Sequence, residues 1–252
     1  MEIIGVIPAR YNSTRLPGKP LIRIQGKPLI QWTYENALKS NMLSRIIVAT
    51  DDRRIFRVVQ MFGGQSILTS SRCRTGTDRI AEVASKIKGD IFVNIQGDEP
   101  LIHYSIINRI VRELIKNKSL QMVTAAVPIT ELRQLKDQNN VKVVLNRKGL
   151  AHYFSRSIIP FPRDCTDLTR ALKRKYFLKH CGIYAYRRDF VCKFRRLSKS
   201  FNEHIEKLEQ LRVLDYGYNI KVLRTQFDSL GVDTKHDVKK INRMLKPKTK
   251  EG

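Results

Sequence analysis

The sequence lacks the long apolar segments that mark membrane-spanning and secreted proteins. No run of about 18 apolar residues occurs among its 252 residues, so no segment is predicted to cross a bilayer as a helix. The N-terminus shows no basic stretch followed by an apolar run and a small-residue cleavage site. We therefore expect a cytoplasmic protein without membrane insertion.

Cysteine is scarce and scattered along the chain. The four cysteines form no CxxC pair, and the five histidines show no metal-ligand spacing with them. This pattern argues against a zinc site and against a disulfide framework, and it is typical of reduced thiols in the cytosol.

Acidic residues are few, with 23 Asp and Glu against 48 Lys and Arg, which gives a net charge of +25. Such a balance favours an acidic partner: nucleic acid, an anionic membrane surface, or a phosphorylated or carboxylated small molecule. Composition alone does not choose among these classes. Residues 170–199 hold eleven of the basic residues and one acid, Asp189, and we expect them to lie on a solvated surface.

The first half of the chain alternates short aliphatic runs with amphipathic stretches. We predict strands at residues 3–9, 45–50 and 91–96, and helices at residues 28–40, 53–62 and 77–88. Strands that alternate with helices of this length indicate βαβ units and a doubly wound α/β sheet.

The second half is more mixed. Strands are predicted at residues 141–146, 179–187 and 219–225, and a helix at residues 104–116. Asn202 is predicted to cap one helix with an inward stripe of Ile205, Leu208, Leu211 and Leu214. Thr234 and Asp237 are predicted to start the last helix, with Val238, Ile241 and Leu245 inside. We expect one domain, with a core over residues 1–125 and 205–245 and a smaller mixed lobe over about 126–204.

The loop after the first predicted strand carries three cations, Arg10, Arg15 and Lys19, within ten residues. It is not a Walker A loop, because Ser13 stands where that motif needs glycine and Pro20 replaces the magnesium-binding hydroxyl. Ligands in open α/β sheets bind at the carboxyl ends of strands, so these cations suit a triphosphate. A solvated basic loop with a turn at Gly18 is the alternative.

Two acidic positions stand out in a chain short of acids. Asp98 and Glu99 follow the strand predicted at residues 91–96, and Asp233 directly precedes the last helix. Carboxylates at strand ends can hold Mg²⁺ against phosphate oxygens, because Mg²⁺ keeps several waters and takes only one or two protein ligands. The alternatives are an ordinary turn at Asp98 and an ordinary helix cap around Asp233 and Thr234.

Several further side chains could serve a site or only the structure. Thr75 and Gly76 open a predicted helix and could present N–H groups to an anion, although helix capping explains them nearly as well. The others are Arg156, His180, Tyr184, Glu209 and Gln210, each of which could also have a purely structural role.

Seven segments, in this order and spacing, make the sequence resemble the 3-deoxy-manno-octulosonate cytidylyltransferases, or CMP-KDO synthetases, of lipopolysaccharide biosynthesis. The resemblance covers residues 3 to about 241, and the segments read IPARYNSTRLPGKPL, TGTDRIAEV, VNIQGDEPLI, YFSRSIIP, CGIYAYRRDF, LEQLRVLDYG and GVDT. The first and third are shared loosely with other sugar nucleotidyltransferases, whereas YFSR, GIYAY and LEQLR are specific to the family.

The resemblance implies a Rossmann-like nucleotide-diphospho-sugar transferase sheet and a homodimer that transfers CMP from CTP to 3-deoxy-D-manno-octulosonate (KDO) with Mg²⁺. It implies catalytic roles for Lys19, Arg15 and Asp98, with Asp98 and Asp233 as metal ligands. The implied nucleotide-binding residues are Ala9, Arg10, Ser13, Arg15, Lys19, Thr75 and Gly76. The implied sugar-binding residues are Gln96, Arg156, His180, Tyr184, Glu209 and Gln210.

Two positions depart from the family pattern: the basic stretch Arg72-Cys73-Arg74, and Asn146 where an acid is expected. A related sugar acid, such as 8-amino-KDO or a nonulosonic acid, is the alternative substrate. A nucleic-acid-binding protein that uses residues 170–199 is a further alternative. It is disfavoured because the sequence contains no recognised nucleic-acid reader motif.

Overall fold

The computed structural model describes residues 1–12, 16–73, 75–165 and 167–246. The contacts within the chain divide it into two compact units, Met1–Ser105 with Ser229–Gly252, and Ile106–Asp228. This division assigns residues 106–125 and 205–228 to the second unit, whereas the sequence suggested placing them with the core. Among the described residues no helix is both long and apolar enough to span a bilayer.

The first unit is built on parallel strands in the order β6-β1-β4-β5. The strands are β1 (Ile3–Ala9), β4 (Arg45–Thr50), β5 (Gln65–Leu68) and β6 (Ile91–Asn94), and the helices are α1 (Leu29–Leu38), α2 (Arg53–Met61) and α3 (Gly76–Lys86). The predictions for β1 and β4 are confirmed. Strand β6 ends two residues early, because a turn closes there with Glu99 N–H donating to the Gln96 carbonyl.

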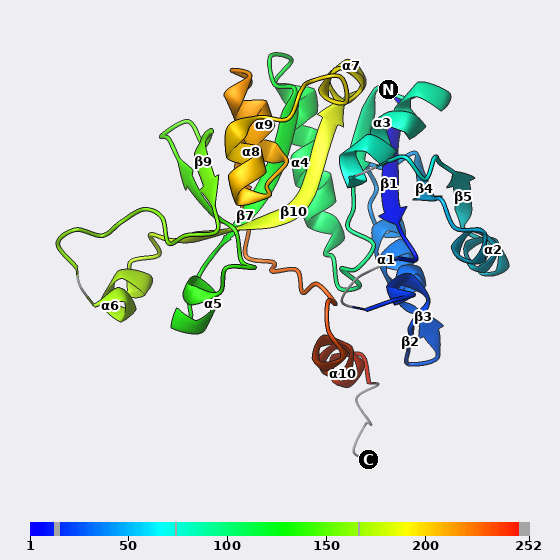
Figure 1. The fold of residues 1–252 in the computed structure, drawn as a ribbon, viewed down its shortest axis with the longest axis horizontal. Coiled ribbons are helices and arrows are strands. Elements are labelled where there is room, and N and C mark those ends of the chain that lie inside the picture. The colour runs from blue at the N-terminus through cyan, green and yellow to red at the C-terminus, as the bar shows by residue number, and fades with distance from the viewer. Residues whose placement is uncertain (13–15, 74, 166, 247–252) are drawn as a thin grey trace. The chain divides into compact units, whose positions relative to one another are not determined.

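A second small core lies beside this sheet within the same unit. It joins Leu16, Ile24, Leu29, Val232 and Ile241. Leu16 precedes the short helix η1 (Lys19–Leu21), Ile24 belongs to the hairpin of β2 (Arg23–Ile24) and β3 (Lys27–Pro28), and Leu29 begins α1. Val232 lies in the segment before the last helix, α10 (Lys235–Met244), and Ile241 lies within that helix. Figure 1 shows α10 beside this hairpin. Thr234 caps α10 in a capping box with Asp237, as predicted.

The second unit contains a mixed sheet. Strand β7 (Met122–Pro128) pairs parallel with β11 (Ile220–Arg224) and antiparallel with β10 (Leu178–Arg187). Strand β8 (Lys142–Leu145) pairs with β9 (Ala151–Ser155), and the Asn146 side chain accepts hydrogen bonds from Lys148 and Leu150 N–H in the turn between them. Asn146 therefore has a structural role that a carboxylate could also fill.

The helices of this unit are short, apart from α4. Helix α4 (Tyr104–Lys116), whose first two residues belong to the first unit, matches its prediction. The others are α5 (Leu132–Lys136), α6 (Leu168–Lys173), α7 (Arg188–Phe194), α8 (Phe201–Glu206) and α9 (Gln210–Asp215).

The single helix predicted after Asn202 is wrong. Ser200 caps α8, and the chain then breaks at Lys207, whose φ of 55° is left-handed, before α9 begins. The break leaves Ile205 63% exposed, while Leu208 and Leu211 are buried. A bidentate ion pair between Arg212 and Glu203, both buried, ties α9 to α8.

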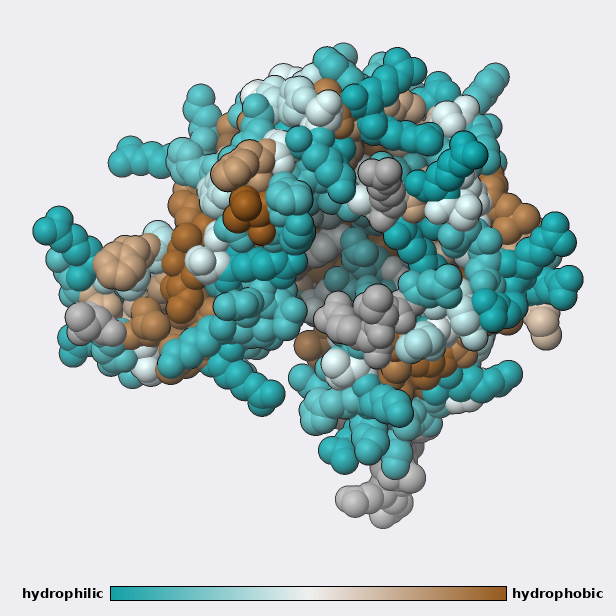
Figure 2. Space-filling model, in the orientation of Figure 1, coloured by the Kyte–Doolittle hydropathy of each residue, from teal (hydrophilic) through white to brown (hydrophobic). Residues whose placement is uncertain are grey.

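The excess of positive charge lies mainly on the surface, as predicted for residues 170–199. Within that range the side chains of Arg170, Lys173, Arg174, Lys175, Lys193, Arg195, Arg196 and Lys199 are exposed. Hydrophilic residues also cover most of the face seen in Figure 2. The remaining three basic residues of this segment, Lys179, Arg187 and Arg188, are half-buried.

Candidate active site

The loop that follows β1 folds back on itself. Gly18 N–H donates to the Tyr11 carbonyl, 2.9 Å away, and Gly18 takes a left-handed φ of 67° before η1. A side chain at Gly18 would also press on the Tyr11 ring at 3.3 Å. Glycine is thus required here, and the fold-back returns Lys19 to the carboxyl end of β1. Ser13 and Arg15 lie outside the described residues.

A second segment approaches the same place from β6. The backbone of Gly97 passes so close to β1 that a Cβ would stand 2.9 Å from the Pro8 carbonyl. The next residue, Asp98, accepts a backbone hydrogen bond at 2.9 Å from Val232 N–H. Since Val232 is anchored in the small apolar core, this contact places Asp233 beside Asp98, although 135 positions separate them in the sequence.

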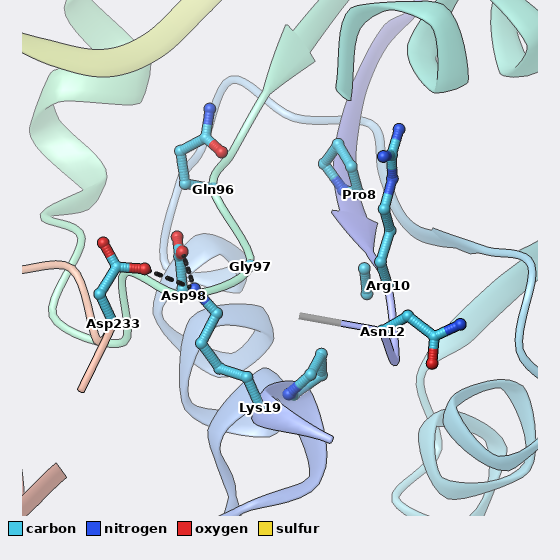
Figure 3. Close-up of a pocket in the computed structure, with 10 residues that line it drawn as sticks. Pro8, Arg10, Asn12, Lys19, Gln96, Gly97, Asp98 and Asp233 are labelled. Carbon is cyan, nitrogen blue, oxygen red and sulfur yellow. Dashed lines mark hydrogen bonds and ion pairs between the residues drawn. The ribbon is translucent and has the colours of Figure 1, made fainter. Parts of the chain in front are cut away.

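Lys19 joins the two carboxylates. Its Nζ lies 2.5 Å from Asp98 Oδ2 and 2.9 Å from Asp233 Oδ1 (Figure 3). Burial alone would lower the pKa of Lys19, but the Asp98 carboxylate, followed by Asp233, outweighs burial, so the pKa is raised above its ordinary value. Lys19 is therefore a permanent cation that both carboxylates share.

These groups line a cavity of about 420 Å³ within the first unit. Figure 3 shows Gln96, Asp98 and Asp233 on one side of it and Pro8, Arg10 and Asn12 on the other. The sequence reasoning missed the contributions of Pro8, Asn12, Pro20 and Gly97. Asn12 could have been predicted because it lies among the cationic residues of the loop. Pro8, Pro20 and Gly97 have no polar side-chain group that would mark them as site residues. The lining residues are Pro8, Ala9, Arg10, Asn12, Lys19, Pro20, Gln96, Gly97, Asp98 and Asp233.

The carboxylate pair suits a divalent cation. Both acids already hold one cationic group, the Lys19 ammonium, between them. Among the described residues no group of three or more His, Cys, Asp or Glu side chains could hold a metal. A metal at Asp98 and Asp233 would thus take its remaining ligands from water or phosphate, as Mg²⁺ commonly does in proteins.

Thr75 and Gly76 lie at the start of α3. The Thr75 hydroxyl accepts from Asp78 N–H at 3.1 Å, and Asp78 Oδ2 accepts from Thr75 N–H at 3.0 Å. The capping alternative therefore holds for Thr75. A Cβ at Gly76 would stand 3.7 Å from the Pro8 side chain, so this helix end faces the carboxyl end of β1. Nucleotide binding by Thr75 and Gly76 stays a prediction.

Apart from Gln96, the predicted sugar-binding residues lie in the second unit. His180 packs edge-on against Phe154 and lies beside Tyr184, with ring centroids 5.0 and 5.2 Å apart. Glu209 and Gln210 stand where α9 begins, and Gln210 is buried.

Arg156 is held rigidly by backbone groups. Its Nε donates to the Glu206 carbonyl at 2.8 Å and its Nη1 to the Gln138 carbonyl at 3.0 Å. This arrangement fixes the plane of the guanidinium while Nη2 remains for another acceptor.

His180 is neutral over the ordinary pH range. Burial lowers its pKa from 6.5 to about 3. Its Nε2 lies 3.0 Å from the Thr124 hydroxyl, which itself donates to the Ile183 carbonyl at 2.6 Å. The His180 Nε2–H is therefore the donor to Thr124, and Nδ1 keeps its lone pair.

The low pKa of His180 predicts a pH-dependent stability. The unfolded chain takes up a proton near pH 6.5 that the folded protein resists until about pH 3. Stability is thus full above pH 6.5 and falls on acidification by up to about 1.4 kcal/mol per pH unit from this residue. The free energy of unfolding, measured with denaturant between pH 7 and pH 5, should depend less steeply on pH in His180→Gln than in the wild type. An unchanged slope would contradict the assignment.

The comparisons with known proteins agree with one another. A family profile described as "Cytidylyltransferase" matches residues 4–222. The 3-deoxy-manno-octulosonate cytidylyltransferase of Fusobacterium nucleatum subsp. nucleatum is 47% identical over 98% of both chains. That of Geotalea daltonii is also 47% identical, over 98% of this chain and 99% of its own.

A solved structure of CMP:2-keto-3-deoxy-manno-octonic acid synthetase complexed with CTP gives the same answer for the fold. It superposes with a TM-score of 0.90 at 40% identity, over 97% of this chain and 98% of its own. The predicted α/β nucleotidyltransferase fold is confirmed. With relatives this similar over their full length, the chain belongs to the 3-deoxy-manno-octulosonate cytidylyltransferase family.

Proposed function

We propose that this protein transfers CMP from CTP to KDO, giving CMP-KDO and pyrophosphate for lipopolysaccharide biosynthesis. The observation that carries the proposal is the cavity at the carboxyl ends of β1 and β6, where Lys19 bridges two carboxylates, in a chain 47% identical to enzymes of that name. In the transfer, the anomeric hydroxyl oxygen bonds to the α-phosphorus of CTP. The bond from that phosphorus to the oxygen that bridges it to the β-phosphate breaks, pyrophosphate leaves with the electron pair, and the hydroxyl proton passes to solvent water.

The chain's part in this reaction is positioning and charge neutralisation. Arg10 and Lys19, with Ser13 and Arg15 from the same loop, would bind the triphosphate. Asp98 and Asp233 would hold Mg²⁺, which when bound supplies positive charge at the phosphate oxygens and lowers the pKa of the attacking hydroxyl. Because Lys19 is already cationic between these acids, its ammonium can move to a phosphate oxygen without changing its protonation state.

In the second unit, the residues proposed for the sugar have suitable chemistry. The remaining Nη2 of the fixed Arg156 guanidinium suits the carboxylate of a 2-keto sugar acid. His180 Nδ1 can accept a hydrogen bond from a sugar hydroxyl, and Tyr184 beside it can donate or accept one. Glu209 and Gln210, in the same unit, would complete this set.

We further propose that the protein works in the cytoplasm as a homodimer, as the family resemblance implies. Support for the compartment comes from the cysteines, because Cys73, Cys165, Cys181 and Cys192 form no disulfide with one another. Light scattering on the purified protein should give twice the mass of the chain, and a monomeric mass would refute the dimer.

The substrates can be tested by pyrophosphate release. CTP with KDO in Mg²⁺ should release pyrophosphate rapidly, while UTP with KDO, or CTP with a sialic acid, should be far slower. A chelator should stop release, and added Mg²⁺ should restore it. Faster release with a nonulosonic acid or with 8-amino-KDO would replace the proposed sugar, and no release with any sugar acid would refute the transferase activity.

A further inference from the structure

Arg10, one of the proposed triphosphate-binding residues, is oriented by a backbone group far away in the sequence. Its Nη2 donates to the Cys73 carbonyl at 2.7 Å. Cys73 belongs to the loop between β5 and α3, and Arg10 lines the cavity at the end of β1. The direction of this guanidinium therefore depends on where the loop holds the Cys73 carbonyl.

The loop forms a tight turn around Ser70. Cys73 N–H donates to the Ser70 carbonyl at 3.2 Å, and Arg72 N–H donates to the Ser70 hydroxyl at 3.1 Å. The turn is attached to the sheet on one side, because Thr69 N–H donates to the Thr50 carbonyl at 2.8 Å.

One buried carboxylate holds the turn to α3. Both oxygens of Glu82 lie 3.1 Å from Ser70 N–H, and Cys73 Sγ donates to Oε2 at 3.1 Å. Glu82 is 8% exposed, and Lys86 one turn along the helix donates to Oε1 at 2.7 Å. Burial would raise the pKa of Glu82, but Lys86, Cys73 and Ser70 outweigh it and lower the pKa to about 2. The anchor is therefore a carboxylate at neutral pH.

We propose that Glu82 is a positioning residue for nucleotide binding, which acts through the Ser70–Cys73 turn to fix the Arg10 guanidinium. The proposal also gives a role to Cys73, which lies in the basic stretch that departs from the family pattern. The Cys73 thiol donates to Glu82, and the Cys73 carbonyl accepts from Arg10. The inference rests on the proposed function, because it takes Arg10 to bind the triphosphate of CTP.

The test is CTP affinity by calorimetry in Mg²⁺, together with steady-state kinetics. Glu82→Ala should weaken CTP binding by about tenfold or more, since small displacements of a binding group have effects of this size. Glu82→Gln keeps an oxygen for Ser70 N–H and should lose less. The KM for the sugar acid should not change in either variant. Lys86→Ala is the matched control: it removes the exposed partner of Glu82 and leaves the turn attached, so CTP affinity should stay at the wild-type value.

A double variant of Glu82 and Arg10 distinguishes the positioning of Arg10 by Glu82 from a general loss of protein stability. In an Arg10→Ala background, Glu82→Gln should weaken CTP binding no further. Full additivity, or equal losses for CTP and sugar acid, would overturn the inference while leaving the proposed function intact. Failure of the wild-type protein to bind CTP at all would overturn the proposed function instead. Should Glu82→Ala not fold, Glu82→Gln alone and in the Arg10→Ala background decides the question.

Discussion

Asp98→Asn is expected to lower the turnover of CTP and KDO by about a thousandfold, the upper range for removing one preorganised group from an active site. The amide keeps the shape of the side chain but binds Mg²⁺ poorly and no longer pairs with the Lys19 ammonium. The fold should survive, because Asp98 connects to Val232 through its backbone carbonyl. Pyrophosphate release and circular dichroism, measured on the same sample, check both expectations.

The adjacent acid supplies the matched control. The Glu99 carboxylate accepts a hydrogen bond from the Ser229 hydroxyl at 2.6 Å, which an amide oxygen can also accept. Glu99→Gln should therefore stay within about threefold of the wild-type turnover, the equivalent of well under one kcal/mol. Near-normal activity of Asp98→Asn, or equal losses in the two variants, would show that the acids of this turn were assigned wrongly.

Lys19→Met should reduce turnover by about a hundredfold, because it removes the half-buried cation that both carboxylates share and that is proposed to bind the triphosphate. A second effect follows from the same geometry. With its competitor gone, the carboxylate pair should bind Mn²⁺ more tightly in the absence of nucleotide, as measured by electron paramagnetic resonance.

Lys27→Met is the control for that variant. Lys27 also forms an ion pair, with Glu35 at 2.8 Å, but it is 42% exposed and lies outside the cavity. Turnover and Mn²⁺ binding of Lys27→Met should match the wild type. Weaker Mn²⁺ binding by Lys19→Met than by the wild type would mean that the lysine does not compete with metal for these oxygens.

The sequence predicts those parts of the fold in which the local pattern of residues determines the structure. Strands β1 and β4 are continuous apolar runs and were predicted at their observed bounds, and the capping box at Thr234 was readable from its spacing. Strand β5 was missed because its residues QSIL are half-buried or exposed and form no apolar run. The break at Lys207 was missed because lysine gives no local signal for a left-handed conformation.

The sequence identifies residues of the candidate site but not how these residues are arranged in space. Asp98, Asp233 and Lys19 stood out because acids are rare in this chain and cations cluster after β1. Nothing in the sequence indicated that Lys19 bridges the two acids, because that contact depends on the long-range bond from Val232 to Asp98 and on the packing of Val232. Equally, the contact of Arg10 with the Cys73 carbonyl joins the end of β1 to a loop 63 positions further along the chain, which only the fold brings together.

Asp98 and Asp233, 135 positions apart in the sequence, are proposed to form the metal-binding centre of the CTP site. Electron paramagnetic resonance can measure Mn²⁺ binding to the wild type, Asp98→Asn and Asp233→Asn. Each protein is first saturated with a non-hydrolysable CTP analogue. We expect one tightly bound Mn²⁺ in the wild-type complex and an Mn²⁺ affinity reduced by about tenfold or more in each variant. Equal Mn²⁺ affinity in all three proteins, with the nucleotide bound, would contradict it.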